Sequence, residues 1–177
     1  MQLLMKSNMN SAFRRKVVGS LAVGVVSASC FFNWGRNKTI YPPDVITTKN
    51  RLYPTYIIRN TEIQDVVLTK APLLLNFTYQ GDKNCNRLTQ ALFDILSDAK
   101  RYPLDSSQYP IELANVACDS LEARDLMLTY GVSKVPSVVC LKKQIPVDVY
   151  VPADVSSGAN EEHLSDWIKS IAAGGKS

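Results

Sequence analysis

Residues 73–77, with the sequence LLLNF, constrain the fold of this chain more than any other segment. A continuous apolar run of this length is typical of a strand that is covered on both faces of a sheet. After a short loop, apolar residues recur at spacings of three and four, which predicts an amphipathic helix of about four turns. These residues are Leu88, Ala91, Leu92, Ile95, Leu96 and Ala99. A buried strand that leads into a helix with a core-facing stripe indicates an α/β domain.

The flanking sequence repeats this alternation of strand and helix patterns. Further strands are predicted at residues 55–60 and 111–118, and a hairpin at residues 137–143 and 146–151. Further helices are predicted at residues 61–71, 119–131 and 160–173. The first begins at Asn60 or Thr61, the second ends before Gly131 at the C′ position, and the third begins at Asn160. The predicted order is therefore β-α-β-α-β-α-β-β-α.

The first 38 residues differ in composition from the remainder. They hold six basic residues and neither Asp nor Glu, which leaves 14 basic against 16 acidic residues, about −2, for the remainder. Nothing in that remainder predicts a nucleic-acid-binding surface, so we expect no nucleic acid partner. Residues 17–34 carry no charge and are long enough to cross a bilayer as a helix. We therefore predict a single transmembrane helix that places the chain in a membrane.

Residues 1–16 are basic, contain Ser and Asn, and lack acidic residues, as mitochondrial presequences do. We expect a targeting segment at 1–16, a linker at 35–54 and a disordered tail at 174–177. The predicted location is the mitochondrial inner membrane, with the globular domain facing the intermembrane space because more basic residues precede the span than follow it. The alternatives are a signal anchor of the secretory pathway and a cleaved secretory signal.

Three segments of residues 55–173 resemble parts of thioredoxin-like domains. KAPLLLNFTY is similar to the strand that precedes the redox motif. VACDSLEARDLMLTYGV is similar to the strand, Asp-containing turn and helix that come before the family's Gly-Val-x-x-x-Pro segment. GVSKVPSVVCL is similar to the family's segment with a cis proline against the active site. The resemblance implies an α/β thioredoxin-like three-layer fold with a central mixed sheet, preceded by the transmembrane helix. It also implies a cis peptide bond before Pro136.

The resemblance assigns a role to each position of the loop between the central strand and its helix. Aligning FTYQGDKNC with the family's Trp-Cys-x-x-Cys motif places Gly81 at the tryptophan, Asp82 at the first cysteine and Cys85 at the second. In the family the first cysteine attacks disulfides and the second resolves the intermediate. The buried acid of thioredoxins falls on Asn76. The attacking thiol and the acid are therefore both missing.

The other cysteines and the single histidine do not extend this motif. Cys118 and Cys140 lie in apolar strands, where a free cysteine behaves as a small hydrophobe. Cys30 lies inside the predicted span. With no Cys-x-x-Cys pair we expect no metal site and no cofactor. His163 is predicted in the first turn of the last helix, in a surface or capping role.

The sequence therefore predicts a membrane-tethered, redox-inactive thioredoxin-like protein that acts by binding a protein partner. We expect it to be a subunit, assembly factor or adaptor of a mitochondrial membrane complex. The expected binding residues are Tyr79, Gly81, Asp82, Lys83, Val135 and Pro136, because a proline loop can offer backbone groups to an extended chain. The alternative is a single-cysteine thiol oxidoreductase or redox sensor that uses Cys85. A third possibility is a purely structural part of a large assembly.

Overall fold

The computed structural model describes residues 38–102, 110–153 and 160–174. The chain divides into two units, Met1–Arg36 and Asn37–Ser177, and all described residues belong to the second. The predicted targeting segment and transmembrane helix fall outside the described residues. Among those that are described, no helix is long and apolar enough to span a membrane.

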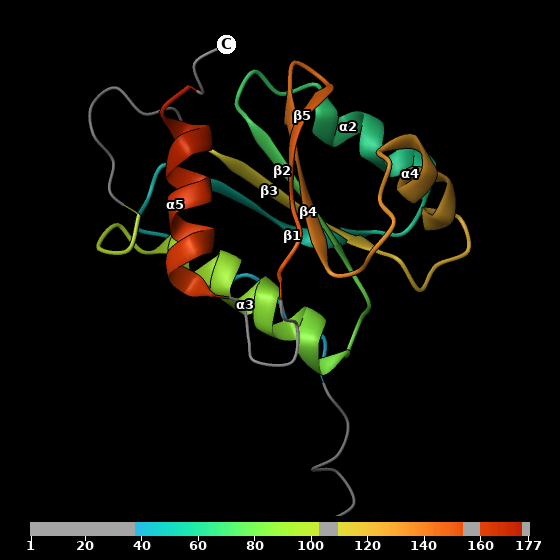
Figure 1. The fold of residues 1–177 in the computed structure, drawn as a ribbon, viewed down its shortest axis with the longest axis horizontal. Coiled ribbons are helices and arrows are strands. Elements are labelled where there is room, and N and C mark those ends of the chain that lie inside the picture. The colour runs from blue at the N-terminus through green and yellow to red at the C-terminus, as the bar shows by residue number, and fades with distance from the viewer. Residues whose placement is uncertain (1–37, 103–109, 154–159, 175–177) are drawn as a thin grey trace, which may run out of the picture. The chain divides into compact units, whose positions relative to one another are not determined.

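The second unit contains five strands that alternate with helices (Figure 1). The strands are β1 (Arg51–Ile57), β2 (Leu73–Thr78), β3 (Glu112–Ala117), β4 (Ser137–Lys142) and β5 (Ile145–Tyr150). The α-helices are α2 (Ile63–Val67), α3 (Lys83–Ser97), α4 (Ala123–Thr129) and α5 (Glu161–Ala172), with a 3-10 turn at Asn60–Glu62. This order of elements confirms the predicted one.

The strands form one mixed sheet in the order β1-β3-β2-β4-β5. β3 pairs with β1 and β2 in parallel, whereas β4 is antiparallel to β2 and β5. β2 lies at the centre, and all six of its residues are buried. This confirms the prediction that the apolar run at residues 73–77 is a strand covered on both faces.

Helices cover both faces of the sheet and give it three layers (Figure 1). α3 and α5 pack on one face, where Leu92, Leu96 and Ile168 are fully buried against Leu74. α2 and α4 pack on the other face, where Leu126 is buried against Phe77 in a second cluster. Successive residues of β2 enter opposite clusters because strand side chains alternate between faces.

The first strand differs from the prediction at both ends. It begins at Arg51 rather than Thr55, within the segment predicted as a linker, and it ends at Ile57 rather than Asn60. Arg51 pairs with Glu112 of β3, and Pro54 is tolerated because β1 is an edge strand with a free side. The pairing that extends the strand is with residues some sixty positions away, which no local pattern could predict.

Residues before β1 also contact the domain. Thr48 Oγ1 and Asn50 Nδ2 donate hydrogen bonds to the carbonyl of Leu96, and Thr47 Oγ1 donates to that of Ser97 at 3.0 Å. These groups satisfy carbonyls at the end of α3 that have no partner within the helix. Thr47, Thr48 and Asn50, which fall in the predicted linker, are therefore hydrogen-bonded to the end of α3.

The first predicted helix is shorter than expected and begins differently. The structure has the 3-10 turn at Asn60–Glu62 and only five residues of α2, and Arg59 is the residue before the turn rather than Asn60 or Thr61. The Glu62 carboxylate accepts the backbone N–H of Ile58 at 2.8 Å and of Arg59 at 3.2 Å. The prediction of Asn60 or Thr61 as the N-cap is therefore wrong, and the side-chain hydrogen bonds at this helix start come from Glu62.

Other local predictions are confirmed. Gly131 ends α4 with φ +67°, and the N–H of Val132 bonds to the Met127 carbonyl at 2.8 Å, which is the hydrogen bond of a Schellman motif. Asn160 Oδ1 accepts the N–H of His163 at the start of α5. β4 and β5 form the predicted hairpin through Lys143 and Gln144.

Candidate functional site

The loop between β2 and α3, with the first helical residue Lys83, carries four of the six predicted binding residues. The chain turns after Thr78, and the N–H of Asp82 bonds to the Tyr79 carbonyl at 3.3 Å. Gly81 has φ +77°, in the left-handed region that favours glycine. Tyr79, Asp82 and Lys83 are exposed. This turn therefore presents three side chains to solvent at the start of α3.

Asp82 is the N-cap of α3. Its Oδ1 accepts the backbone N–H of Asn84 at 3.0 Å and of Cys85 at 2.8 Å, so it satisfies two donors that have no partner within the helix. The hydrogen bond from Cys85 is the main cause of the lowered pKa of Asp82. Asp82 is therefore a capping carboxylate that is ionised at neutral pH.

Cys85 lies directly behind this carboxylate and is 1% exposed. Burial, together with a smaller contribution from the neighbouring Asp82, raises the pKa of its thiol to about 11. Burial likewise raises the pKa of Cys118 to about 12 and of Cys140 to about 11. A thiol of this kind is protonated at neutral pH, and the protonated form is a poor nucleophile.

Val135 and Pro136 reach the same end of the sheet as the Tyr79 turn. Their peptide bond is cis, as the resemblance implied. β4 begins at the next residue, Ser137, which pairs with Phe77 near the end of β2. Val135 is half-buried against the core cluster below α4, and Pro136 is buried. The fold therefore brings the two predicted segments together, although the Pro136 side chain is not exposed.

Asn76 occupies the buried face of β2 behind this end of the sheet. Its Nδ2 donates to Thr89 Oγ1 of α3 at 2.9 Å and to Asn115 Oδ1 of β3 at 2.8 Å. Asn76 Oδ1 and Asn115 Nδ2 are buried without a hydrogen-bond partner among the described residues. An uncharged amide pair thus occupies the position at which the resemblance places a buried acid.

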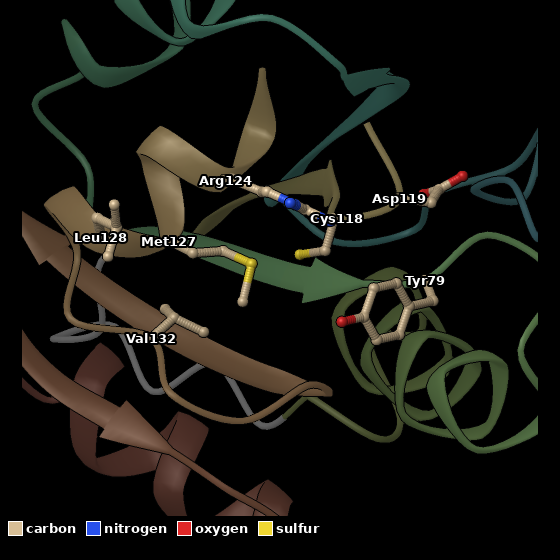
Figure 2. Close-up of a pocket in the computed structure, with 7 residues that line it drawn as sticks. All are labelled: Tyr79, Cys118, Asp119, Arg124, Met127, Leu128 and Val132. Carbon is tan, nitrogen blue, oxygen red and sulfur yellow. The ribbon is translucent and has the colours of Figure 1, made fainter. Parts of the chain in front are cut away.

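A pocket of about 440 Å³ opens next to Tyr79 (Figure 2). We call it the α4 pocket, and its lining residues are Tyr79, Cys118, Asp119, Arg124, Met127, Leu128 and Val132. Figure 2 shows the Met127 thioether and the Cys118 thiol pointing into the space between α4 and the Tyr79 ring. Sequence analysis identified only Tyr79 among these residues. The available clue was Leu128, an apolar residue that lies off the buried stripe of α4 and is 81% exposed.

The single histidine does not extend the site. His163 is exposed in the first turn of α5, where its ring lies 5.6 Å from the ring of Tyr150. α5 covers the face of the sheet opposite α4 (Figure 1). Within the described part of the chain, no group of three or more His, Cys, Asp or Glu residues is arranged to hold a metal ion.

No protein-family model and no curated protein matches this sequence. Solved structures of thioredoxins are similar to it in fold. A mutant thioredoxin from Halobacterium salinarum is 22% identical, and the match covers 71% of this chain and 96% of that one with a TM-score of 0.51. Thioredoxin NaTrxh from Nicotiana alata has the same coverage and TM-score at 15% identity. Oxidised thioredoxin O2 from Arabidopsis thaliana is 14% identical, with 73% and 99% covered and a TM-score of 0.51. The described domain therefore has a thioredoxin-like fold.

Proposed function

We propose that this chain is a membrane-tethered thioredoxin-like protein that has no redox activity and acts by binding a protein partner. Its role is that of a subunit, assembly factor or adaptor of a complex in the mitochondrial inner membrane, with the globular domain in the intermembrane space. The observation that carries this proposal is the pairing of an ionised Asp82 with a buried Cys85 at the start of α3.

Disulfide exchange needs an exposed thiolate that attacks a sulfur atom. By the resemblance, Asp82 stands where the attacking cysteine belongs, and a carboxylate cannot form the mixed disulfide. Cys85 has both low exposure and a raised pKa, so it does not replace the missing thiolate. Asn76 cannot exchange a proton as a carboxyl group does. These three residues favour binding over the alternative of a single-cysteine oxidoreductase.

What the site retains is a surface at one end of the sheet. Tyr79, Lys83 and the half-buried Val135 border the end of β2, and the α4 pocket opens beside Tyr79. Large exposed apolar side chains around a pocket are a common mark of a protein interaction site. Leu121, which is 76% exposed, precedes α4, and Leu128, which is 81% exposed, lies within it. This surface supports a protein as the partner.

The location is tested with the full chain carrying a C-terminal tag. We expect the tagged protein to resist extraction by alkaline carbonate and to become protease-sensitive only when the mitochondrial outer membrane is opened. Extraction by carbonate, or recovery in secretory membranes, would contradict the proposed location.

The binding role is tested by co-purification after cross-linking in intact mitochondria. We expect Val135→Asp to remove a partner that the wild type retains, whereas the matched change Val45→Asp does not, because Val45 is 73% exposed and lies outside the site. Cys85→Ser should retain the partner. Loss of the partner in Cys85→Ser but not in Val135→Asp would favour the redox alternative instead.

A further inference from the structure

The α4 pocket lies where the carboxyl ends of two parallel strands meet. Tyr79 follows β2 directly, and Cys118 and Asp119 follow β3. The N–H of Cys118 bonds to the Thr78 carbonyl at 2.9 Å, which holds the two strand ends together. In α/β sheets this is the edge at which ligands bind, because the connecting loops leave a crevice there.

Apolar and sulfur-bearing side chains line one part of the pocket. Met127 and Val132 are half-buried in its wall, and the Cys118 thiol, 5% exposed, lies at its base (Figure 2). The Tyr79 ring, 43% exposed, stands opposite α4. A volume of about 440 Å³ falls within the range of sites that bury small ligands or side chains. This part of the pocket therefore suits an uncharged, apolar group.

Two charged residues line the remainder of the pocket. Arg124 is exposed, and among the described residues its guanidinium makes no salt bridge and no side-chain hydrogen bond. Asp119 makes one long contact, 3.5 Å, with the N–H of Gln80. The two residues do not form an ion pair with each other. The pocket thus offers an unpaired guanidinium on the α4 side and a carboxylate at the strand ends.

A guanidinium matches the planar geometry of a carboxylate and can donate two parallel hydrogen bonds to it. Asp119 repels a second carboxylate at its own end of the pocket, so an incoming acid is directed towards Arg124. Asp119 can accept a backbone N–H of the same ligand. This combination fits an extended peptide better than an isolated anion, because a peptide supplies an apolar side chain, a carboxylate and an N–H together.

Building on the proposed function, we infer that the partner places an apolar side chain in the α4 pocket and pairs an adjacent Asp or Glu carboxylate with Arg124. The partner segment is therefore an acidic and apolar peptide in extended form, bound at the pocket that adjoins the Tyr79 turn.

The chain contains a convenient reporter for this site. Its four methionines are Met1, Met5, Met9 and Met127, so only Met127 lies in the described domain. The full chain, labelled with ¹³C-methyl methionine and held in detergent micelles, is titrated with N-acetyl-Leu-Glu-amide. The comparison probes are N-acetyl-Leu-Gln-amide, which lacks the charge, and N-acetyl-Ala-Glu-amide, which lacks the large side chain.

We expect the Met127 methyl resonance to shift with a millimolar midpoint, at probe concentrations up to about 20 mM, as for other minimal ligands. The midpoint for the Leu-Glu probe should be about 3- to 5-fold lower than for the Leu-Gln probe, since Arg124 is exposed and its ion pairs are weakened by solvent. The Ala-Glu probe should shift the resonance least.

Substitutions test whether Arg124 causes the preference for the Leu-Glu probe over the Leu-Gln probe. Arg124→Gln should bring the Leu-Glu and Leu-Gln midpoints together. The matched control Arg101→Gln should leave the ratio unchanged, because Arg101 lies on the other face of the sheet with Asp94 and Glu161. Asp119→Asn should lower the midpoint of the Leu-Glu probe about twofold by removing a like charge.

Two results would overturn the inference. One is an unshifted Met127 methyl with all three probes, and the other is a Leu-Glu preference that survives Arg124→Gln. Neither result bears on the proposed function, which is judged by co-purification with the Val135→Asp variant. Conversely, retention of the partner by Val135→Asp would contradict the proposed function even if the probes bind the pocket.

Discussion

The carboxylate of Asp82 accepts the backbone N–H of Cys85 across a distance of 2.8 Å. The contact stabilises the first turn of α3 and at the same time places a negative charge beside a buried thiol. Burial and the nearby carboxylate each raise the pKa of the Cys85 thiol, so both oppose its ionisation. A capping carboxylate in this position therefore stabilises the helix and disfavours thiol chemistry.

Asp82→Ala is expected to lower the free energy of unfolding by about 1 kcal/mol, the usual cost of losing an N-cap side chain. The pKa of Asp82 is lowered in the folded state, so its stabilisation is present above the unfolded pKa of about 3.9 and is lost as pH falls through the folded pKa. The difference between variant and wild type should therefore shrink in acid.

The measurement is urea unfolding of the full chain in a mild detergent at pH 7 and at low pH. Trp34→Phe leaves Trp167 as the only tryptophan, so its fluorescence reports on the domain alone. Lys83→Ala is the control, because Lys83 is an exposed neighbour outside the cap. Equal stability of Asp82→Ala and Lys83→Ala at pH 7 would exclude a capping role.

Cys85 is expected to react with an alkylating reagent about 100-fold more slowly than an ordinary thiol at neutral pH. Its pKa is raised from 9.0 to about 11, which reduces the thiolate fraction by that factor before steric protection is counted. The rate is measured across pH 6 to 9 in full-length protein with Cys30, Cys118 and Cys140 changed to Ala. A rate that levels off below pH 8 would instead indicate an activated thiol.

Asn76 and Asn115 are expected to be energetically coupled. Asn76→Leu leaves a buried Asn115 oxygen without its donor, so it should cost about 1–3 kcal/mol, and Asn115→Leu should cost a similar amount. The double variant removes both polar groups and should be less destabilised than the sum of the two by about 1 kcal/mol or more. Additive losses in urea unfolding would show that the amide pair does not act as a unit.

The β4–β5 turn offers a stabilising substitution. Lys143 and Gln144 have φ values of +50° and +69°, although neither residue favours the left-handed region. Changing them to Asn and Gly, the pair preferred in such turns, should raise the free energy of unfolding by about 1 kcal/mol. Gln144→Ala is the control and should not stabilise, because alanine gains nothing at positive φ. A stabilised alanine variant would mean that the backbone conformation is not the cause.

The parts of the fold that sequence analysis predicted correctly are those governed by neighbours in the chain. Residues 73–77 lie in β2, Gly131 ends α4, and Asn160 caps α5. Each follows from a local rule on periodicity or on the unpaired groups at helix ends. The start of β1 and the short α2 were predicted incorrectly, because pairing with β3 and the carboxylate of Glu62 decided them.

The sequence by itself determined the order of strands and helices, because period-two and period-3.6 patterns and helix caps are local properties. The three-layer arrangement was implied by the resemblance of three segments to thioredoxin-like domains. Only the tertiary structure decided that Cys85 faces the interior and that Arg124 shares a pocket with Tyr79, a residue from a different strand end. Burial of a thiol depends on which helix face packs on the sheet. A pocket depends on which loops the sheet brings to one edge, and residues 45 positions apart become neighbours only when β2 and β3 pair.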